Sequence, residues 1–233
     1  MQTLYEGSEG DGHESKKDGH GSGSQSNTQI MLLTAPAEIA CLLEQLERIA
    51  GELSWQPRNQ IRTSANQAIH IAAVVGDQVA GGLQVVVNKQ AVGNKQALVH
   101  SEVTKGDGSN CLPCLSVWPE VDIGEQLAAH VTILALERKY RGHPGLFWPL
   151  CVELWRWCHA SGIRTLFLEA TPTTMRVYQR MGWPLEIVGE LRPHWGEDCY
   201  LCLTDIQQME QEISCRASRS ARYHAFLEQA RRK

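Results

Sequence analysis

One stretch of the chain, residues 128–145, constrains the fold more than any other. It reads AAHVTILALERKYRGHPG, and an apolar pattern with helical spacing follows it. An apolar segment with the character of a strand (130–136) runs directly into a basic, glycine-bearing turn and then into a helix. Backbone N–H groups converge at a helix N-terminus, where they bind anions such as phosphate. The stretch therefore predicts a strand, an anion-binding turn and a helix in direct succession.

The chain is long enough to bury one substantial hydrophobic core. It has 233 residues, of which 42% are hydrophobic, and two full domains would be cramped. Residues 1–28 are rich in Gly, Ser and charged side chains, so we expect a disordered tail there. Residues 206–233 predict a polar, basic, helical C-terminal tail. A single domain over residues 29–205 remains.

Charge and hydropathy argue against several partners and locations. A net charge of −4 and a pI of about 6.1 disfavour nucleic acid or an anionic membrane as the main partner. No segment reaches the roughly 18 apolar residues of a membrane span, and the N-terminus lacks the apolar core of a secretory signal. We therefore expect a cytoplasmic protein. Several of its eight cysteines fall in apolar patterns, where a reduced cysteine acts as a small hydrophobe.

The first half of the domain predicts a strand, a helix and an antiparallel hairpin. Residues 29–33 read as a strand, and the spacing of apolar residues over 39–53 marks one face of a helix. Two β-rich runs, 69–75 and 79–88, are separated by Gly76-Asp77-Gln78, which indicates a hairpin turn. Residues 96–103 could extend this meander by a strand. The irregular segment 104–124 has the length of a functional loop.

The second half alternates strands with helices. After the strand at 130–136, residues 146–161 predict a helix buried on more than one side, 164–170 a strand and 173–181 a short helix. Such alternation implies parallel pairing. Residues 185–189 and 199–204 predict final strands on either side of a loop at 192–198. The expected fold is α/β, a mixed sheet with an antiparallel N-terminal meander and a parallel central pair, flanked by helices.

Two segments resemble motifs of the GNAT superfamily of acyltransferases. LERKYRG at 136–142 is similar to the family's Val-x-Pro-x-Tyr-Arg-Gly pattern, and VYQRMGW at 177–183 to its Leu-Tyr-x-x-Leu-Gly-Phe segment. The order of elements over 29–205 also follows the family. The resemblance implies an N-acyltransferase that moves an acyl group from a pantetheine thioester, as acyl-CoA or acyl carrier protein, to the amine of a small molecule or amino acid. It implies no tightly bound cofactor and no metal.

The resemblance places the acyl donor along the strand and the turn, with the binding residues Leu134, Leu136, Arg138, Arg141, Gly142, His143, Gly145 and Leu146. Pro144 and Leu146 stand where the family has glycine and a small residue; proline donates no N–H and leucine crowds the backbone. In this departure the turn resembles that of the acyl-homoserine lactone (autoinducer) synthases and of the N-acyl amino acid synthases. The Glu-x-x-Arg pair of those synthases would fall on His130 and Ile133.

Tyr178 falls at the position of the family tyrosine that often protonates the departing thiolate. A phenol with a pKa of about 10 is protonated at neutral pH and can serve as that donor; the alternative is a packing role. For the amine's proton, the groups that could point into a common cleft are His130, Glu102, His100 and Glu169. His130 is the first choice because an imidazole exchanges protons near pH 7. The loop at 104–124 would wall the acceptor pocket.

The sequence leaves open a metal or redox role for its cysteine pairs, and two functions other than acyl transfer. Cys199 and Cys202 lie three apart in a predicted strand and would point to opposite faces, so they should not chelate a metal together. Cys111 and Cys114 could form a redox pair or half of a metal site. The chain could also be a non-catalytic, acyl-CoA-binding regulatory module. The basic residues after position 215 could serve protein interaction, including the docking of an acidic carrier protein.

Overall fold

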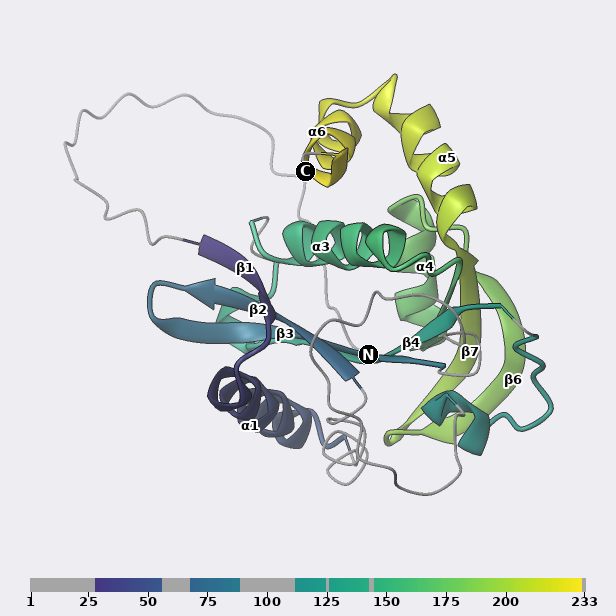
Figure 1. Cartoon of the computed structure of the whole chain (residues 1–233). Helices are drawn as coiled ribbons and strands as arrows, with labels where there is room; N and C mark the ends of the chain where they lie inside the picture. The colour runs from purple at the N-terminus through teal and green to yellow at the C-terminus, as the bar shows by residue number, and fades with distance from the viewer. Residues whose placement is uncertain (1–27, 56–67, 89–111, 125, 143–144, 232–233) are drawn as a thin grey trace, which may run out of the picture.

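The computed structural model describes residues 28–55, 68–88, 112–124, 126–142 and 145–231 (Figure 1). Several predicted features lie outside these residues and stay predictions: the N-terminal tail, the strand at 96–103, and the side chains of His100, Glu102, Cys111 and His143. No helix among the described residues is long and apolar enough to cross a membrane.

A seven-stranded mixed sheet forms the centre of the molecule, in the order β1-β2-β3-β4-β5-β7-β6. β4 and β5 are parallel, and all other neighbours are antiparallel. This confirms the predicted α/β class, its antiparallel N-terminal part and its parallel central pair. The strands are β1 Thr28–Leu33, β2 Ala68–Val75, β3 Gln78–Val87, β4 Ala128–Leu136, β5 Thr165–Ala170, β6 Glu186–His194 and β7 Glu197–Asp205.

Helices cover both faces of the sheet (Figure 1). On one face lies α1 (Pro36–Glu52), whose Leu42, Leu46 and Ile49 are spaced for one helical stripe and are fully buried. The other face carries α3 (Phe147–Ala160), with α4 (Pro172–Arg180) beside it. A short 3-10 helix, η3 (Pro113–Ser116), packs on β4 and β5. Each face thus has its own hydrophobic core.

A bulge in β4 changes which side chains face which core. Val85 pairs with Val131 and Gln84 with Ile133, so Thr132 is an extra residue in β4. Before the bulge, Ala129 and Val131 pack into the core under α3, which turns His130 to the α1 face. Thr132 also reaches that face, because its hydroxyl donates to Oε1 of Gln84 at 2.7 Å. The bulge therefore brings two polar side chains of β4 to the same face.

The final hairpin is longer than predicted, and the expected loop at 192–198 is wrong. β6 and β7 continue through it and pair from Arg192 with Cys199 up to His194 with Glu197. The turn is only Trp195-Gly196, with φ of 61° and 86°. β6 is an edge strand, so it tolerates Pro193 and exposed polar residues that resemble a loop in sequence. The hairpin places Trp195 and His194 on the α1 side of the sheet.

The C-terminal segment is helical and packs on α3. It forms α5 (Ile206–Ala217) and α6 (Ala221–Arg231), which lie beyond α3 in Figure 1. Tyr223 of α6 meets Trp148 of α3 edge to face, with ring centroids 5.7 Å apart. This explains why α3 is buried on more than one side. Among the side chains of the two helices that the structure describes, the buried apolar ones are Ile206, Met209, Ile213 and Leu227.

Candidate functional site

β4 and β5 separate at the middle of the sheet. Their parallel pairing runs from Ala128 with Thr165 to Val131 with Leu168 and then ends. β5 continues beyond this point, with Glu169 and Ala170 paired to β7 on its other side. The second half of β4 therefore has no pairing to β5, and an opening forms between the two strands.

A small cavity lies at this opening. Its lining comes from β4, β5, β7, the residue three positions after α1, and the β6–β7 turn. Most of the lining is apolar, and Glu169 contributes the one carboxylate among the described residues that border it. The lining residues are Trp55, Val131, Thr132, Ile133, Leu134, Glu169, Trp195 and Cys199.

Glu169 lies between two histidines. Its Oε1 is 2.8 Å from Nε2 of His130 and 3.6 Å from Nε2 of His194. The close contact with His130 is not aligned as a hydrogen bond. The side chain of His130 is 2% exposed and that of Glu169 is 9% exposed, and only Glu169 lines the cavity. The structure thus brings together two predicted base candidates, with the carboxylate in front and the imidazole behind it.

His194 is a site residue that the sequence analysis missed. Burial lowers its pKa below the ordinary histidine value; the neighbouring Glu169 carboxylate opposes this effect, and His130 adds to it. Its ring also contacts Trp118 edge to face at 5.6 Å. Trp118 belongs to the segment expected to wall the acceptor pocket, and the part of that segment described here (112–124) borders the site through this contact. The turn lacks an Asn-Gly or Asp-Gly pair, so no local signal in the sequence identified the hairpin or this side chain.

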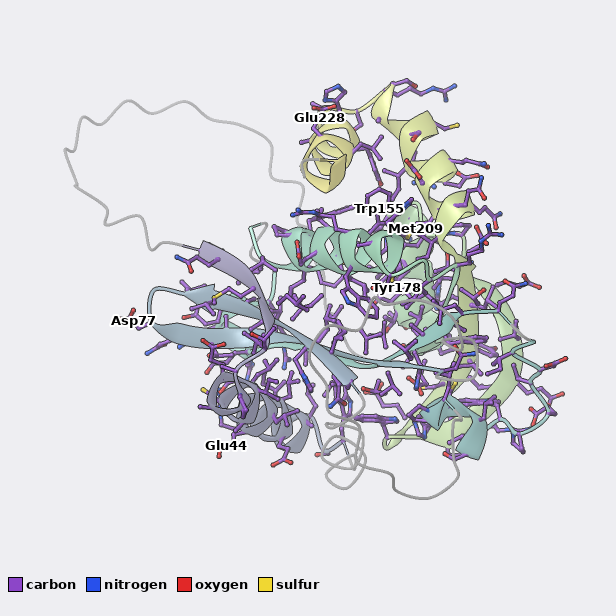
Figure 2. The ribbon with its side chains drawn as sticks, in the orientation of Figure 1. Glu44, Asp77, Trp155, Tyr178, Met209 and Glu228 are labelled. Carbon is purple, nitrogen blue, oxygen red and sulfur yellow. The ribbon has the colours of Figure 1, made fainter. Side chains whose placement is uncertain are left out.

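Tyr178 lies in the interior on the α3 side of the sheet (Figure 2). It is 1% exposed and stacks on Trp183 with ring centroids 5.1 Å apart. Burial raises the pKa of its phenol, and the thiols of Cys151 and Cys202 raise it further. The phenol is therefore protonated at neutral pH, as a proton donor must be. Tyr178 does not border the cavity.

The predicted donor-binding turn follows β4 directly. Leu134 and Leu136 have buried side chains in the core under α3, and so does Leu146 at the start of that helix. Arg141 donates from Nε to the carbonyl of Leu136 at 2.9 Å, which folds the turn back on the strand. Gly142 has φ of +82°, a conformation that suits glycine. The leucines thus act as core residues, and their backbone is the part that remains for a ligand.

A groove joins this turn to the end of α1. It is lined by Glu52, Leu53, Glu137, Arg138, Lys139 and Arg141. Glu137 compensates part of the positive charge of the groove, because it lies 3.4 Å from Lys139; it also lies 2.8 Å from Arg48 of α1. Arg138 is exposed. The predicted Arg138 and Arg141 therefore do lie together, beside more acidic side chains than the sequence suggested.

The cysteines of β7 are buried thiols on opposite faces, as their spacing predicted. Cys199 packs with Trp118 on one face and Cys202 in the core under α3. Burial raises the pKa of Cys199 to about 11 and that of Cys202 to about 12, so neither is a thiolate at neutral pH. Within the described ranges, no three His, Cys, Asp or Glu side chains are arranged to hold a metal ion.

No protein-family model matches the sequence, and no curated protein matches it either. Solved structures match the fold. FeeM, an N-acyl amino acid synthase from uncultured soil microbes, is 13% identical over 80% of this chain and 95% of its own, with a TM-score of 0.61. NAA60 of Arabidopsis thaliana, in complex with acetyl-CoA, is 19% identical over 78% and 99%, with a TM-score of 0.50.

A putative acetyltransferase of the GNAT family from Desulfovibrio desulfuricans is 14% identical over 77% of this chain and 99% of its own, with a TM-score of 0.47. At such identities the likeness concerns the fold alone. The chain shares the fold of FeeM and NAA60, and its mixed sheet has the arrangement that the resemblance to the GNAT superfamily predicted.

Proposed function

We propose that the protein is an N-acyltransferase that moves an acyl group from a pantetheine thioester to the amine of a small molecule or amino acid. The observation that carries the proposal is the place of Glu169: a carboxylate backed by an imidazole at 2.8 Å, facing a cavity at the opening between β4 and β5. An acyl transfer to an amine needs a proton acceptor at such a point.

The donor arm would lie against the separated half of β4. A pantetheine arm is extended and carries amide groups, so it can hydrogen-bond to strand backbone as an added strand does. Its phosphates would lie at the turn, with Arg138, Arg141, Gly142, His143, Gly145 and Leu146 around them. Acyl-CoA and an acyl carrier protein both present this arm, and both are proposed donors.

The side chains of the site can account for each proton that the proposed acyl transfer moves. The amine nitrogen attacks the thioester carbonyl, a C–N bond forms and the C–S bond breaks. Glu169 takes the proton that the amine loses, and the nearby imidazole of His130 accepts it in turn once the two groups align as a hydrogen bond. The proposed proton donor for the leaving thiolate is Tyr178; because it lies on the α3 side and not in the cavity lining, the sulfur of the donor has to reach that side of the opening. A protonated phenol is required for this last step, and burial keeps Tyr178 protonated.

A synthase of N-acyl amino acids or acyl-homoserine lactones is the second candidate. The likeness in fold to FeeM, an N-acyl amino acid synthase, and the departures at Pro144 and Leu146 favour it. This candidate would take its acyl group from a carrier protein. Docking of that acidic partner by the basic C-terminal segment would make exposed Arg219 contribute to carrier binding in a salt-dependent way.

The test is release of free thiol from acetyl-, hexanoyl- and longer acyl-CoA, and from the matching acyl carrier proteins, with a panel of amines and amino acids. We expect release that depends on the amine and is lost in Glu169→Gln. A protein that binds acyl-CoA but transfers nothing to any amine would instead be the regulatory module considered above.

A further inference from the structure

Two tryptophans from distant parts of the chain wall the cavity. Trp55 follows the end of α1, and Trp195 is the first residue of the β6–β7 turn. Their rings meet edge to face, with centroids 6.4 Å apart and an interplanar angle of 88°. Both border the same cavity as Glu169, so a molecule that reaches the carboxylate also touches indole surface.

The backbone at both tryptophans is unusual. Ser54, directly before Trp55, has φ of 57°, and Trp195 has φ of 61°; among the described residues these are the two non-glycine positions with positive φ. A two-residue turn with this backbone favours Asn-Gly, and a bulky residue is unfavourable in it. Backbone preference therefore does not explain a tryptophan at position 195, whereas a role of its side chain does.

The two segments are also held against each other. A Cβ on Gly196 would lie 3.2 Å from the carbonyl oxygen of Ser54, so the turn and the end of α1 are in close contact. Nε1 of Trp55 donates to Oε1 of Glu197 at 3.3 Å. Next to Trp195, the ring of His194 continues the aromatic row at 5.5 Å. The aromatic wall, Trp55 and Trp195, is thus fixed from several sides beside Glu169.

Resting on the proposed acyltransfer, we infer that the acceptor is an amine with a flat, apolar body, whose ammonium group meets Glu169 and whose body lies on the aromatic wall. Indoles attract both aromatic groups and cations, and a buried carboxylate requires a cationic or hydrogen-bonding partner. The competing occupant is the acyl chain of the donor. An uncharged chain would desolvate Glu169 without compensating its charge, so the amine is favoured.

The test compares matched pairs of acceptors: 2-phenylethylamine against propylamine, and L-phenylalanine against L-alanine, with one acyl-CoA. For whichever pair is acylated, we expect kcat/KM to favour the aromatic member by at least about tenfold, the effect of about 1.4 kcal/mol. In Trp195→Asn this ratio should fall about tenfold. The turn should stay folded, because Asn-Gly suits its backbone. Trp195→Phe should retain most of the preference.

The matched control is Trp157→Leu, which changes a partly buried tryptophan of α3 in the core on the other face of the sheet and should leave the ratio unchanged. An unchanged ratio in folded Trp195→Asn would overturn the inference. So would a variant that alters the preferred acyl chain length while the acceptor ratio stays constant, since the wall would then hold the donor. If acylation occurs without aromatic preference, the inference fails and the proposed function stands; if no amine is acylated, both fail.

Discussion

His130 and Glu169 meet across the parallel strands, with Nε2 of the imidazole 2.8 Å from Oε1 of the carboxylate. The register pairs His130 with Phe167, and Glu169 stands two residues further on the same face of β5. Because the strands separate just beyond this point, the carboxylate borders the cavity and the imidazole stays behind it. This arrangement places a second proton acceptor, the imidazole of His130, directly behind Glu169.

The first prediction concerns His130. We expect His130→Asn to lower kcat/KM about 100-fold, the scale of general-base catalysis, because the proton could no longer pass on from Glu169. The substitution should also change the pH dependence of kcat/KM. The pH profile of both proteins is the measurement. His159→Asn, at an exposed site on α3, is the control; an identical profile in both variants would remove His130 from the mechanism.

The second prediction concerns Tyr178. Tyr178→Phe should lower turnover at least about 100-fold and leave acyl-CoA affinity nearly unchanged, since the phenol acts only as the thiolate forms. Tyr223→Phe is the matched control. It removes a hydroxyl that donates to the carbonyl of Arg180, at the end of the same helix, at 3.0 Å. Single-turnover kinetics with both variants separate the roles. Equal turnover of Tyr178→Phe and wild type would make this tyrosine a packing residue.

The sequence predicted the central site elements because their signals are local. β4 and β5 are apolar runs separated by a helical pattern, which leaves parallel pairing as the simple arrangement. It therefore also placed His130 and Glu169 on neighbouring strands. The sequence did not show which of these two side chains faces the cavity. That depends on the opening between β4 and β5, where their pairing ends partway along β4. The spacing of apolar residues along a strand does not show where its pairing ends.

The aromatic wall, Trp55 and Trp195, was not predicted from the sequence, for a different reason. Residues around Trp195 are polar and include Pro193, which is typical of loops, yet an edge strand accepts the same composition. Trp55 follows a helix end, where no periodic pattern remains. Both side chains reach the cavity through turns with positive φ, and such conformations in non-glycine residues depend on tertiary contacts. The packing of α5 and α6 on α3 was likewise not predicted, because their apolar residues are sparse.

The third prediction is a pH dependence of stability from His70. This buried histidine contacts Nε2 of Gln84 at 3.2 Å, and burial lowers its pKa from 6.5 to about 4. Between these values the unfolded chain binds the additional proton, so the free energy of unfolding falls as the pH falls. The loss is about 3 kcal/mol in total, of which about 2 kcal/mol is reached at pH 5.

Urea unfolding at pH 7 and pH 5 measures this contribution. His70→Asn keeps a hydrogen-bonding group but cannot titrate, so the variant should lose less stability over the same range. The same loss in variant and wild type would assign the pH dependence to other groups.

The fourth prediction concerns Arg216 of α5. Its guanidinium donates to the carbonyls of Arg180 at 2.8 Å and Gln179 at 3.3 Å, at the end of the helix that carries Tyr178. Arg216→Ala should therefore lower the free energy of unfolding by about 1 to 2 kcal/mol, and Arg216→Lys by less. Arg219→Ala, at an exposed site on the same segment, should change stability little. Thermal unfolding checks this; equal effects of the two alanine variants would mean that the contact with α4 does not stabilise the fold.

The most direct test of the account is amine-dependent release of free thiol from acyl-CoA by wild type and Glu169→Gln, followed alongside acyl-CoA affinity. The substitution keeps the shape and the hydrogen-bonding capacity of the side chain but removes its ability to take up a proton. The account predicts that thiol release falls by at least about 100-fold, that donor affinity is retained, and that the remaining rate increases with the fraction of unprotonated amine. Undiminished release by Glu169→Gln at neutral pH would contradict it.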